Sequence, residues 1–333
     1  MTGIARRDSV RVPSSLGERE RAAVLAWYDA RGRSIAFRSS RDPYAILVSE
    51  VMAQQTQISR VVPAWRRFLT RFPTLDALAA GSPADVLREW QGLGYDRRAL
   101  NLRRAAIAIR DLHGSRVPST VVELQQLPGV GPYSARAVAA IAFGMPVGAV
   151  DTNVRRVLTR VLALETRADG ARSDAAGVQA AADASVDPWR PADWTHALMD
   201  LGATTCRPRR PHCEACPLAN ACQSRESPDL MPHNPGPVPG ADVVGVSPTV
   251  PRDGRQRREA PTRKQPFDTT TRWLRGRIVD RLRVAPGESW TRVEGPIGRH
   301  DPEAVSRALA ALARDGVVEL DPLDRQRARL ATA

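Results

Sequence analysis

Apolar residues recur at helical spacing through most of the chain, from residue 18 to about residue 223. Pairs such as Asp42-Pro43 and Ser82-Pro83 place a capping side chain directly before a first-turn proline, which is typical of a helix start. No segment in this range shows the sustained alternation that predicts a half-buried strand. We therefore expect an all-α body. Its clearest amphipathic stripe consists of Val61, Trp65, Phe68 and Phe72.

The pattern changes after Ser224. Residues 224–266 are rich in proline, glycine and arginine and have no apolar face, so they indicate a linker. Apolar periodicity returns in residues 267–333, where the spacing predicts two helices and a hairpin around Val317 and Leu320. This order suggests a small winged-helix-like module at the C-terminus.

Charge narrows the class of protein. The 333 residues carry a net charge of +13 at pH 7, which points to a polyanionic partner. Arginine carries nearly all of this surplus, because Lys264 is the single lysine. No apolar run approaches the ~18–20 residues that a membrane span needs, and residues 1–17 lack the apolar core of a signal peptide. We therefore expect a cytoplasmic protein that binds nucleic acid and no membrane.

All four cysteines lie in one short window, in the order Cys206-x6-Cys213-x2-Cys216-x5-Cys222. They are too few for a disulfide-dense secreted scaffold, and core packing alone would not gather them in one stretch. The Cys213/Cys216 pair has zinc-like spacing, although the wide first gap fits a zinc ribbon poorly. Four thiolates can equally hold a [4Fe–4S] cluster. The spacing therefore predicts a metal site and leaves the metal open.

A glycine-rich turn, Leu127-Pro128-Gly129-Val130-Gly131-Pro132, separates two predicted helices. The glycines permit a tight turn, and Pro132 suits the first turn of the following helix. Backbone amides at such a helix start can bind a phosphate group. In a basic chain, this turn resembles the helix-hairpin-helix element that binds DNA.

The ordered motifs together resemble the helix-hairpin-helix DNA glycosylase superfamily and, within it, the MutY-type adenine glycosylases. The resemblance covers residues 21–222 approximately. The matching runs are Ser49–Gln57, Gly92–Tyr95, Leu127–Tyr133, Val150–Val154, Leu198–Ala203 and the cysteine window.

This resemblance implies two helical lobes around a DNA-binding cleft. Residues 41–146 would form a six-helix lobe that contains the hairpin. Residues 18–40 and 147–223 would form the second lobe, which carries the cysteines, and residues 1–17 a flexible tail. The resemblance also implies that the four cysteines hold a [4Fe–4S] cluster.

Two carboxylates are the candidate catalytic residues. Removing a purine from DNA needs an acid that protonates the departing base and an ionised carboxylate that stabilises the oxocarbenium-like sugar. Glu50 lies four residues after Ile46 and three after Leu47, so it shares their apolar helix face, where burial raises the pKa of a carboxyl group. Asp151 directly precedes a helical apolar run and is expected to cap that helix. The resemblance assigns base protonation to Glu50 and sugar stabilisation to Asp151.

The resemblance extends to residues around this pair. Tyr133 and Asn153 match active-site partners, although either could be an ordinary helix-start residue. Gln55 and Tyr95 match residues that wedge into the duplex when the target base leaves the stack, although Tyr95 could instead pack in the core. Further family-like pocket or DNA-binding positions are Arg33, Arg38, Gln54, Gly129, Gly131 and Asp200.

The position of Tyr133 separates two branches of the superfamily. In the endonuclease III branch a lysine at this position forms a Schiff base and cuts the strand. Here the single lysine, Lys264, lies in the predicted linker. We therefore expect base excision without lysine-based strand cleavage.

Several positions depart from the family pattern. Ile35-Ala36-Phe37-Arg38 stands where family members typically have Leu-Pro-Trp-Arg, and Ala53 replaces a leucine. These positions line or border the family's base pocket, which we expect to be wider or shifted here. Asp96 often has a tyrosine counterpart. Residues 267–333 are also too short for the Nudix-like domain that reads 8-oxoguanine in many relatives, so they either add DNA contacts or only pack against the body.

The resemblance implies a monofunctional DNA glycosylase that flips out and excises adenine mispaired with 8-oxoguanine or guanine. We expect a monomer that acts on double-stranded DNA near the nucleoid and leaves the abasic product to an AP endonuclease. A thymine or uracil mismatch glycosylase is the alternative enzyme, since it shares Tyr133, Asp151 and the cysteines. A non-catalytic DNA-damage-binding protein would explain the charge but not both carboxylates.

Overall fold

The structure is a computed structural model that describes residues 15–164, 175–226, 266–285 and 289–332. The chain divides into two compact units, one formed mainly by residues 1–232 and the other by residues 233–329. Most of the predicted tail and linker lies outside the described residues. None of the described helices is long and apolar enough to span a membrane.

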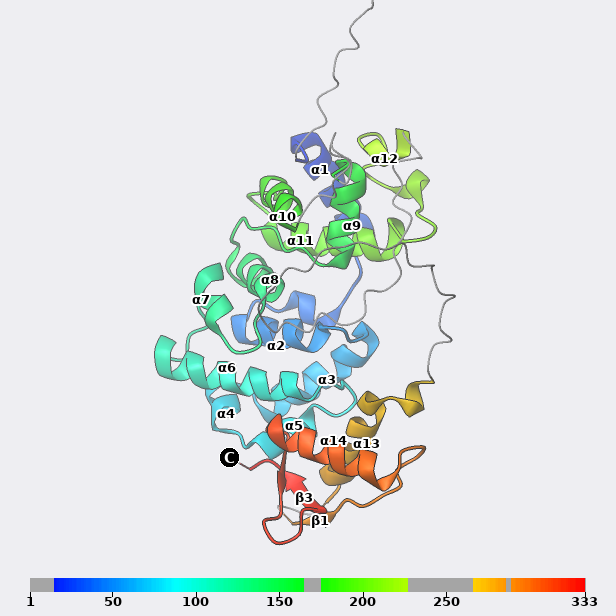
Figure 1. Cartoon of the computed structure of the whole chain (residues 1–333). Coiled ribbons are helices and arrows are strands. Elements are labelled where there is room, and N and C mark those ends of the chain that lie inside the picture. The colour runs from blue at the N-terminus through cyan, green and yellow to red at the C-terminus, as the bar shows by residue number, and fades with distance from the viewer. Residues whose placement is uncertain (1–14, 165–174, 227–265, 286–288, 333) are drawn as a thin grey trace, which may run out of the picture. The chain divides into compact units, whose positions relative to one another are not determined.

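The described part of the first unit is helical, which confirms the all-α prediction (Figure 1). Its α-helices are α1 (Glu18–Arg31), α2 (Pro43–Ala53), α3 (Ile58–Arg71), α4 (Leu75–Ala80), α5 (Pro83–Glu89), α6 (Arg97–His113), α7 (Val121–Gln126), α8 (Pro132–Phe143), α9 (Thr152–Val161), α10 (Ala175–Ala184), α11 (Pro191–Asp200) and α12 (Gln223–Glu226). Shorter helical turns are η1 (Ala36–Ser39), the π-helical η2 (Leu201–Thr205) and η3 (Cys213–Ala215).

Side chains at the helix starts act as predicted. The Asp42 carboxylate accepts hydrogen bonds from the amides of Tyr44 and Ala45 at the start of α2. The Ser82 hydroxyl accepts one from the Asp85 amide at the start of α5. Because Gly81 ends α4 and Ser82 caps α5, residues 75–89 form two helices. The range expected to hold six helices therefore contains seven among the described residues, α2 to α8.

Helix α2 lies at the centre of this lobe and packs against α3, α6 and α8. Every residue from Tyr44 to Met52 is buried, including the polar Ser49 and Glu50. A helix that is buried on all sides is a core element and has no solvent face. The sequence pattern predicted only one buried face, so the structure extends that prediction to the whole helix.

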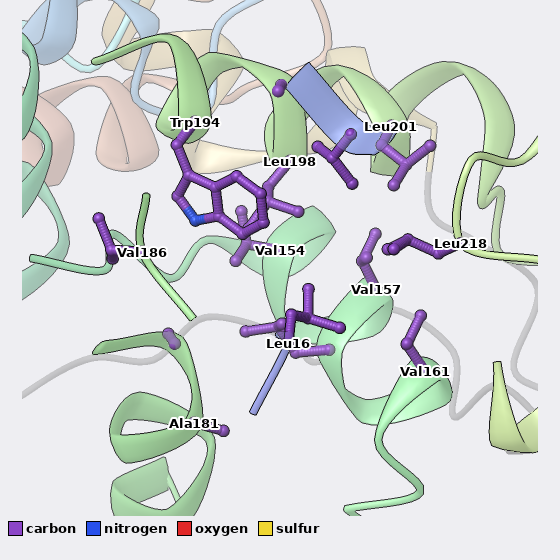
Figure 2. Packing of buried hydrophobic residues seen from close by; sticks show 14 of the residues in the cluster. Leu16, Val154, Val157, Val161, Ala181, Val186, Trp194, Leu198, Leu201 and Leu218 are labelled. Atoms are coloured by element: carbon purple, nitrogen blue, oxygen red, sulfur yellow. The ribbon is translucent and has the colours of Figure 1, made fainter. Parts of the chain in front are cut away.

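The second lobe is assembled from the two ends of the first unit. Figure 2 shows its core, in which Trp194 and Leu198 of α11 pack with Val154 and Val157 of α9. Leu16, just before α1, is part of the same core. The chain therefore leaves this lobe after α1, builds α2 to α8, and returns at α9.

The glycine-rich turn joins α7 to α8. Gly129 has a φ of +79°, and a Cβ there would lie 2.7 Å from the Cβ of Asn101. Both the left-handed backbone and the close approach require glycine at this position. Gly131 then precedes α8, whose first residue is Pro132, as the turn sequence predicted.

The second unit combines helices with a small sheet. It contains η5 (Phe267–Thr269), α13 (Thr271–Arg283), α14 (Pro302–Arg314), β1 (Thr291–Arg292), β2 (Val318–Leu320) and β3 (Arg327–Leu330). Strand β3 lies between β1 and β2 and is antiparallel to β1. Two helices and the adjacent strands β2 and β3 match the predicted elements, whereas β1, which lies between the helices in the sequence, was not predicted.

Candidate active site

Glu50 lies in the middle of α2 and is only 8% exposed. Burial raises the pKa of Glu50 to about 7, although the Tyr133 hydroxyl and the charge of Arg38 oppose this shift. Tyr133, in the first turn of α8, donates a hydrogen bond from its hydroxyl to Glu50 Oε2 at 3.4 Å. Burial, reinforced by Glu50, holds the pKa of Tyr133 well above its ordinary value, so the phenol keeps its proton. Glu50 can therefore carry a proton near neutral pH.

Asp151 is the N-cap of α9, as predicted. Its Oδ1 accepts hydrogen bonds from the amides of Asn153 and Val154 at 2.8 and 2.7 Å, and its Oδ2 accepts one from Asn153 Nδ2 at 3.0 Å. These donors and the positive end of the helix dipole stabilise a negatively charged carboxylate. This half of the site is therefore suited to hold negative charge.

The two carboxyl groups belong to one electrostatic environment. The charge of Asp151 contributes to the raised pKa of Glu50 and also to that of Tyr133. Arg38 acts on the same two groups in the opposite direction. The structure therefore brings Glu50, Tyr133, Asp151 and Arg38 together from four separate segments.

Asp200, at the end of α11, is fully buried and holds two arginines. Arg38 donates to both of its carboxylate oxygens at 2.8 Å, while Arg33 donates from its amide at 2.8 Å and from Nε at 2.7 Å. Burial opposes ionisation, but these hydrogen bonds outweigh it and lower the pKa of Asp200. One turn earlier, burial lowers the pKa of His196 to about 3, so this ring is neutral. The ion pairs fix Arg38, which in turn acts on Glu50.

The predicted wedge residues share an unusual backbone. Gln55 and Tyr95 both have a φ of 52°, in the left-handed region that non-glycine residues adopt at a cost of about 1–3 kcal/mol. Tyr95 is 38% exposed, so its ring does not pack in the core. Gln54, beside this strained position, donates from Nε2 to the Ser134 hydroxyl of α8 at 3.0 Å.

The four cysteines line a single cavity together with apolar residues of α9 and η2. Arg160 is buried beside them, with Nη1 3.4 Å from Cys206 Sγ and hydrogen bonds to the carbonyls of Arg207 and Pro208. Within the described ranges, no group of three or more His, Cys, Asp or Glu side chains is placed to hold a metal ion. Four thiols around one cavity are nevertheless the donor set of either a zinc ion or a [4Fe–4S] cluster.

Sequence reasoning missed one connection behind Asp151. Arg156 Nη2 donates to Asn153 Oδ1 at 2.8 Å and to the Gly202 carbonyl at 2.7 Å, and its Nε donates to the Cys206 carbonyl at 2.8 Å. Gly202 approaches so closely that a Cβ there would lie 2.6 Å from Asn153 Cβ. The available signal was the four-residue spacing of Arg156 and Arg160, which places both on one face of α9.

The sequence of the chain matches a known protein family and several of its members. Residues 48–177 match the HhH-GPD superfamily base excision DNA repair protein family. The chain is 39% identical over 297 residues to the adenine DNA glycosylase of Mycolicibacterium smegmatis, and the match covers 89% of this chain and 91% of that relative. It is 42% identical over 219 residues to the human adenine DNA glycosylase, covering 62% of this chain and 39% of the human protein.

A solved structure agrees with the fold. A thermostable thymine-DNA glycosylase matches with a TM-score of 0.58 and 26% identity, over 62% of this chain and 94% of that one. The helical lobes, the hairpin and the relatives therefore lead to the same assignment. The chain belongs to the adenine DNA glycosylase family within the HhH-GPD superfamily of base excision DNA repair proteins.

Proposed function

We propose that the protein is a monofunctional DNA glycosylase that excises adenine mispaired with 8-oxoguanine or guanine. The observation that carries this proposal is the pairing of a buried, protonatable Glu50 with a hydrogen-bonded Asp151 in one electrostatic environment. The names of the relatives support adenine as the target base.

In the proposed mechanism, Glu50 donates its proton to a ring nitrogen of the extruded adenine. The glycosidic C–N bond then breaks, and the base leaves with both the bonding electrons and the added proton. The ionised Asp151 stabilises the cationic sugar until water adds to the anomeric carbon and loses a proton to a carboxylate. Tyr133 and Asn153 act as positioning residues, because they hydrogen-bond to Glu50 and Asp151 respectively.

The reaction stops at the abasic site in this proposal, because Tyr133 matches the position at which the lyase branch carries its lysine. None of the residues that the structure describes is a lysine, and the single lysine of the chain, Lys264, lies outside them. We expect borohydride to trap no efficient covalent complex between the protein and its DNA product. A strong lysine-dependent trap would contradict monofunctional excision.

We propose that Cys206, Cys213, Cys216 and Cys222 hold a [4Fe–4S] cluster. When bound, the cluster would have a structural and electrostatic role. It would fix the position of the basic loop that follows Cys206, so that this loop can contact DNA phosphates. Aerobically purified protein should contain about four iron and four sulfide ions and absorb at roughly 400 nm. One zinc ion per chain without visible absorption would instead support the zinc alternative.

We propose that the protein binds double-stranded DNA as a monomer, at the nucleoid in the cytoplasm. An AP endonuclease would then process the abasic product. The hairpin glycines, Gly129 and Gly131, would present backbone amides to a phosphate. Gln54, Gln55 and Tyr95 would contact the distorted duplex. A salt titration of the dissociation constant should give a steep slope, since phosphate contacts release counterions.

Two observations favour a second candidate, a thymine or uracil mismatch glycosylase. Ala53 is smaller than the residue usual in adenine-specific relatives, and a thymine-DNA glycosylase shares the fold at 26% identity. The discriminating experiment measures single-turnover excision of adenine, thymine and uracil opposite guanine or 8-oxoguanine. Adenine release that Glu50→Gln strongly reduces supports the first proposal, and faster thymine or uracil release supports the second. DNA binding without any excision would support the non-catalytic alternative.

A further inference from the structure

Arg98, in the first turn of α6, gathers backbone carbonyls from two segments far apart in the sequence. Its Nη1 donates to the carbonyls of Val51, Met52 and Gln54 at 2.9, 3.0 and 2.6 Å. Its Nη2 donates to the Thr56 hydroxyl at 2.9 Å. These acceptors belong to the last turn of α2 and the loop that follows it. That end of a helix has unpaired carbonyls and a partial negative charge, which suits a guanidinium.

The same guanidinium binds the loop before α6. Its Nη2 also donates to the carbonyls of Leu93 and Gly94 at 3.2 and 3.0 Å, and its Cζ lies 5.4 Å from the centre of the Tyr95 ring. The Arg98 Cζ also lies 5.5 Å from the ring centre of the fully buried Trp90, whose indole nitrogen donates to the Gly94 carbonyl. One side chain therefore joins the loop of Gln55 to the loop of Tyr95.

The two joined loops carry strained residues. Gln55 and Tyr95 both adopt left-handed backbones without being glycine, and such backbones persist only where surrounding contacts hold them. Arg98 contacts the carbonyl directly before each of them, those of Gln54 and Gly94. One guanidinium therefore contacts the residue before each strained backbone.

We propose that Arg98 is a positioning residue for base extrusion, holding Gln55 and Tyr95 as one rigid wedge. This inference rests on the proposed function, because it takes the target base out of the duplex before Glu50 acts. It predicts that Arg98 matters for unstacking the base and not for breaking the glycosidic bond. Lysine cannot replace it, because an ammonium has three donors and lacks the planar fork that reaches acceptors on two sides.

The test compares two duplexes that differ only in the cost of extrusion. In the first, adenine pairs opposite 8-oxoguanine, and in the second, adenine faces a stable abasic analogue and is already unpaired. We expect Arg98→Met to slow single-turnover excision about tenfold or more on the first duplex and much less on the second. Arg98→Lys should resemble Arg98→Met. Thr56→Val removes one acceptor of Arg98 together with the hydrogen bonds that the Thr56 hydroxyl donates to the Gln54 and Leu93 carbonyls, and it should give a smaller loss of the same kind.

Two controls accompany these rates. Arg110→Met removes an exposed arginine from the same helix, paired with Asp111, and should leave both rates unchanged. A 2-aminopurine placed beside the target adenine reports unstacking by its fluorescence, independently of excision, and this signal should fall in Arg98→Met. Thermal unfolding of each variant confirms that it is folded.

The outcomes separate this inference from the proposed function. Equal losses on both duplexes, or normal rates and fluorescence in Arg98→Met, would overturn the positioning role while excision by the wild type stands. If the wild-type protein raises 2-aminopurine fluorescence but excises nothing, the proposed function fails and the fluorescence comparison still tests Arg98. If the wild-type protein gives no fluorescence rise, the extrusion role of Arg98 is overturned as well.

Discussion

The two candidate catalytic carboxyl groups occupy opposite kinds of helix position. Glu50 lies in the middle of α2, a helix buried on every side, and burial is the main cause of its raised pKa. Asp151 lies at the open start of α9, where three donors lie within 3.0 Å of its oxygens. The comparison teaches that position on a helix assigns the role: an interior position favours a neutral acid, and an N-terminus favours an anion.

The largest effect on excision should come from removing the acidic proton of the buried Glu50. Glu50→Gln keeps the shape of the side chain but cannot donate an acidic proton. We expect single-turnover excision to fall about 10²–10⁴-fold, the contribution typical of general acid catalysis. DNA binding, measured at one stated salt concentration, should persist. Substantial excision by this variant would show that Glu50 is not the acid.

The next largest effect should come from removing the charge at the helix start. Asp151→Asn preserves a good N-cap, so the free energy of unfolding should change by less than about 1 kcal/mol. A neutral amide cannot stabilise a cationic sugar, and we expect excision to fall about 100-fold or more. A folded variant with normal rates would contradict the assigned role, and Asp151→Ala should add a measurable loss of stability.

Changing the pH near neutrality should act through Glu50. Glu50 must be protonated to act and has a pKa of about 7, so the single-turnover rate should fall as pH rises through 7, approaching tenfold per unit above it. In Glu50→Gln the residual rate should lose this dependence. A wild-type rate that rises through pH 7 would contradict the assignment of Glu50 as the acid.

The same raised pKa affects stability. The folded state binds the Glu50 proton more tightly than the unfolded state does, because the pKa of Glu50 is about 7 in the folded state and has its ordinary value of 4.5 in the unfolded state. The associated stabilisation is fully present below pH 4.5 and is lost as pH rises through about 7. The difference in the free energy of unfolding between Glu50→Gln and the wild type should therefore favour the variant more at pH 8 than at pH 5. Chemical denaturation of both proteins at the two pH values measures this difference.

The smallest effect on excision should come from displacing Asn153, whose side chain donates a hydrogen bond to Asp151. In Gly202→Ala the new methyl group would lie 2.6 Å from Asn153 Cβ and 2.9 Å from its carbonyl oxygen. Displacing Asn153 should cost about 1–3 kcal/mol of stability and slow excision several-fold. The matched control is Gly276→Ala in α13, where an added Cβ meets nothing within 4 Å. Equal behaviour of the two variants would show that Asn153 tolerates displacement.

Local features of this molecule were predictable from sequence. The caps at Asp42, Ser82 and Asp151 depend on a side chain and amides two or three residues away, so the chain pattern contains both partners. The burial of Glu50 follows from its spacing to Ile46 and Leu47. These predictions succeed because the interacting groups are close in sequence.

Contacts between distant segments were not predictable in the same way. Arg98 reaches carbonyls more than forty residues away, and every backbone carbonyl is an equivalent acceptor in the sequence. The left-handed backbones of Gln55 and Tyr95 lack the glycine that would have indicated them. Leu112 fits the apolar spacing of α6 yet is 77% exposed, because spacing predicts a face but not how far its packing partner extends.

The discontinuous core of the second lobe has a consequence for protein synthesis. The amide of Leu16 donates to the hydroxyl of Ser185, across 169 residues of chain. At translation rates of about 5–20 residues per second, roughly 10–30 seconds pass between the synthesis of these two groups. During that interval the lobe of α2 to α8 can fold. The apolar side chains of α1 stay exposed meanwhile, because α9 and α11, which complete their core, have not yet been synthesised. The nascent chain of this repair enzyme should therefore expose a chaperone-binding segment near its N-terminus until α11 has left the ribosome.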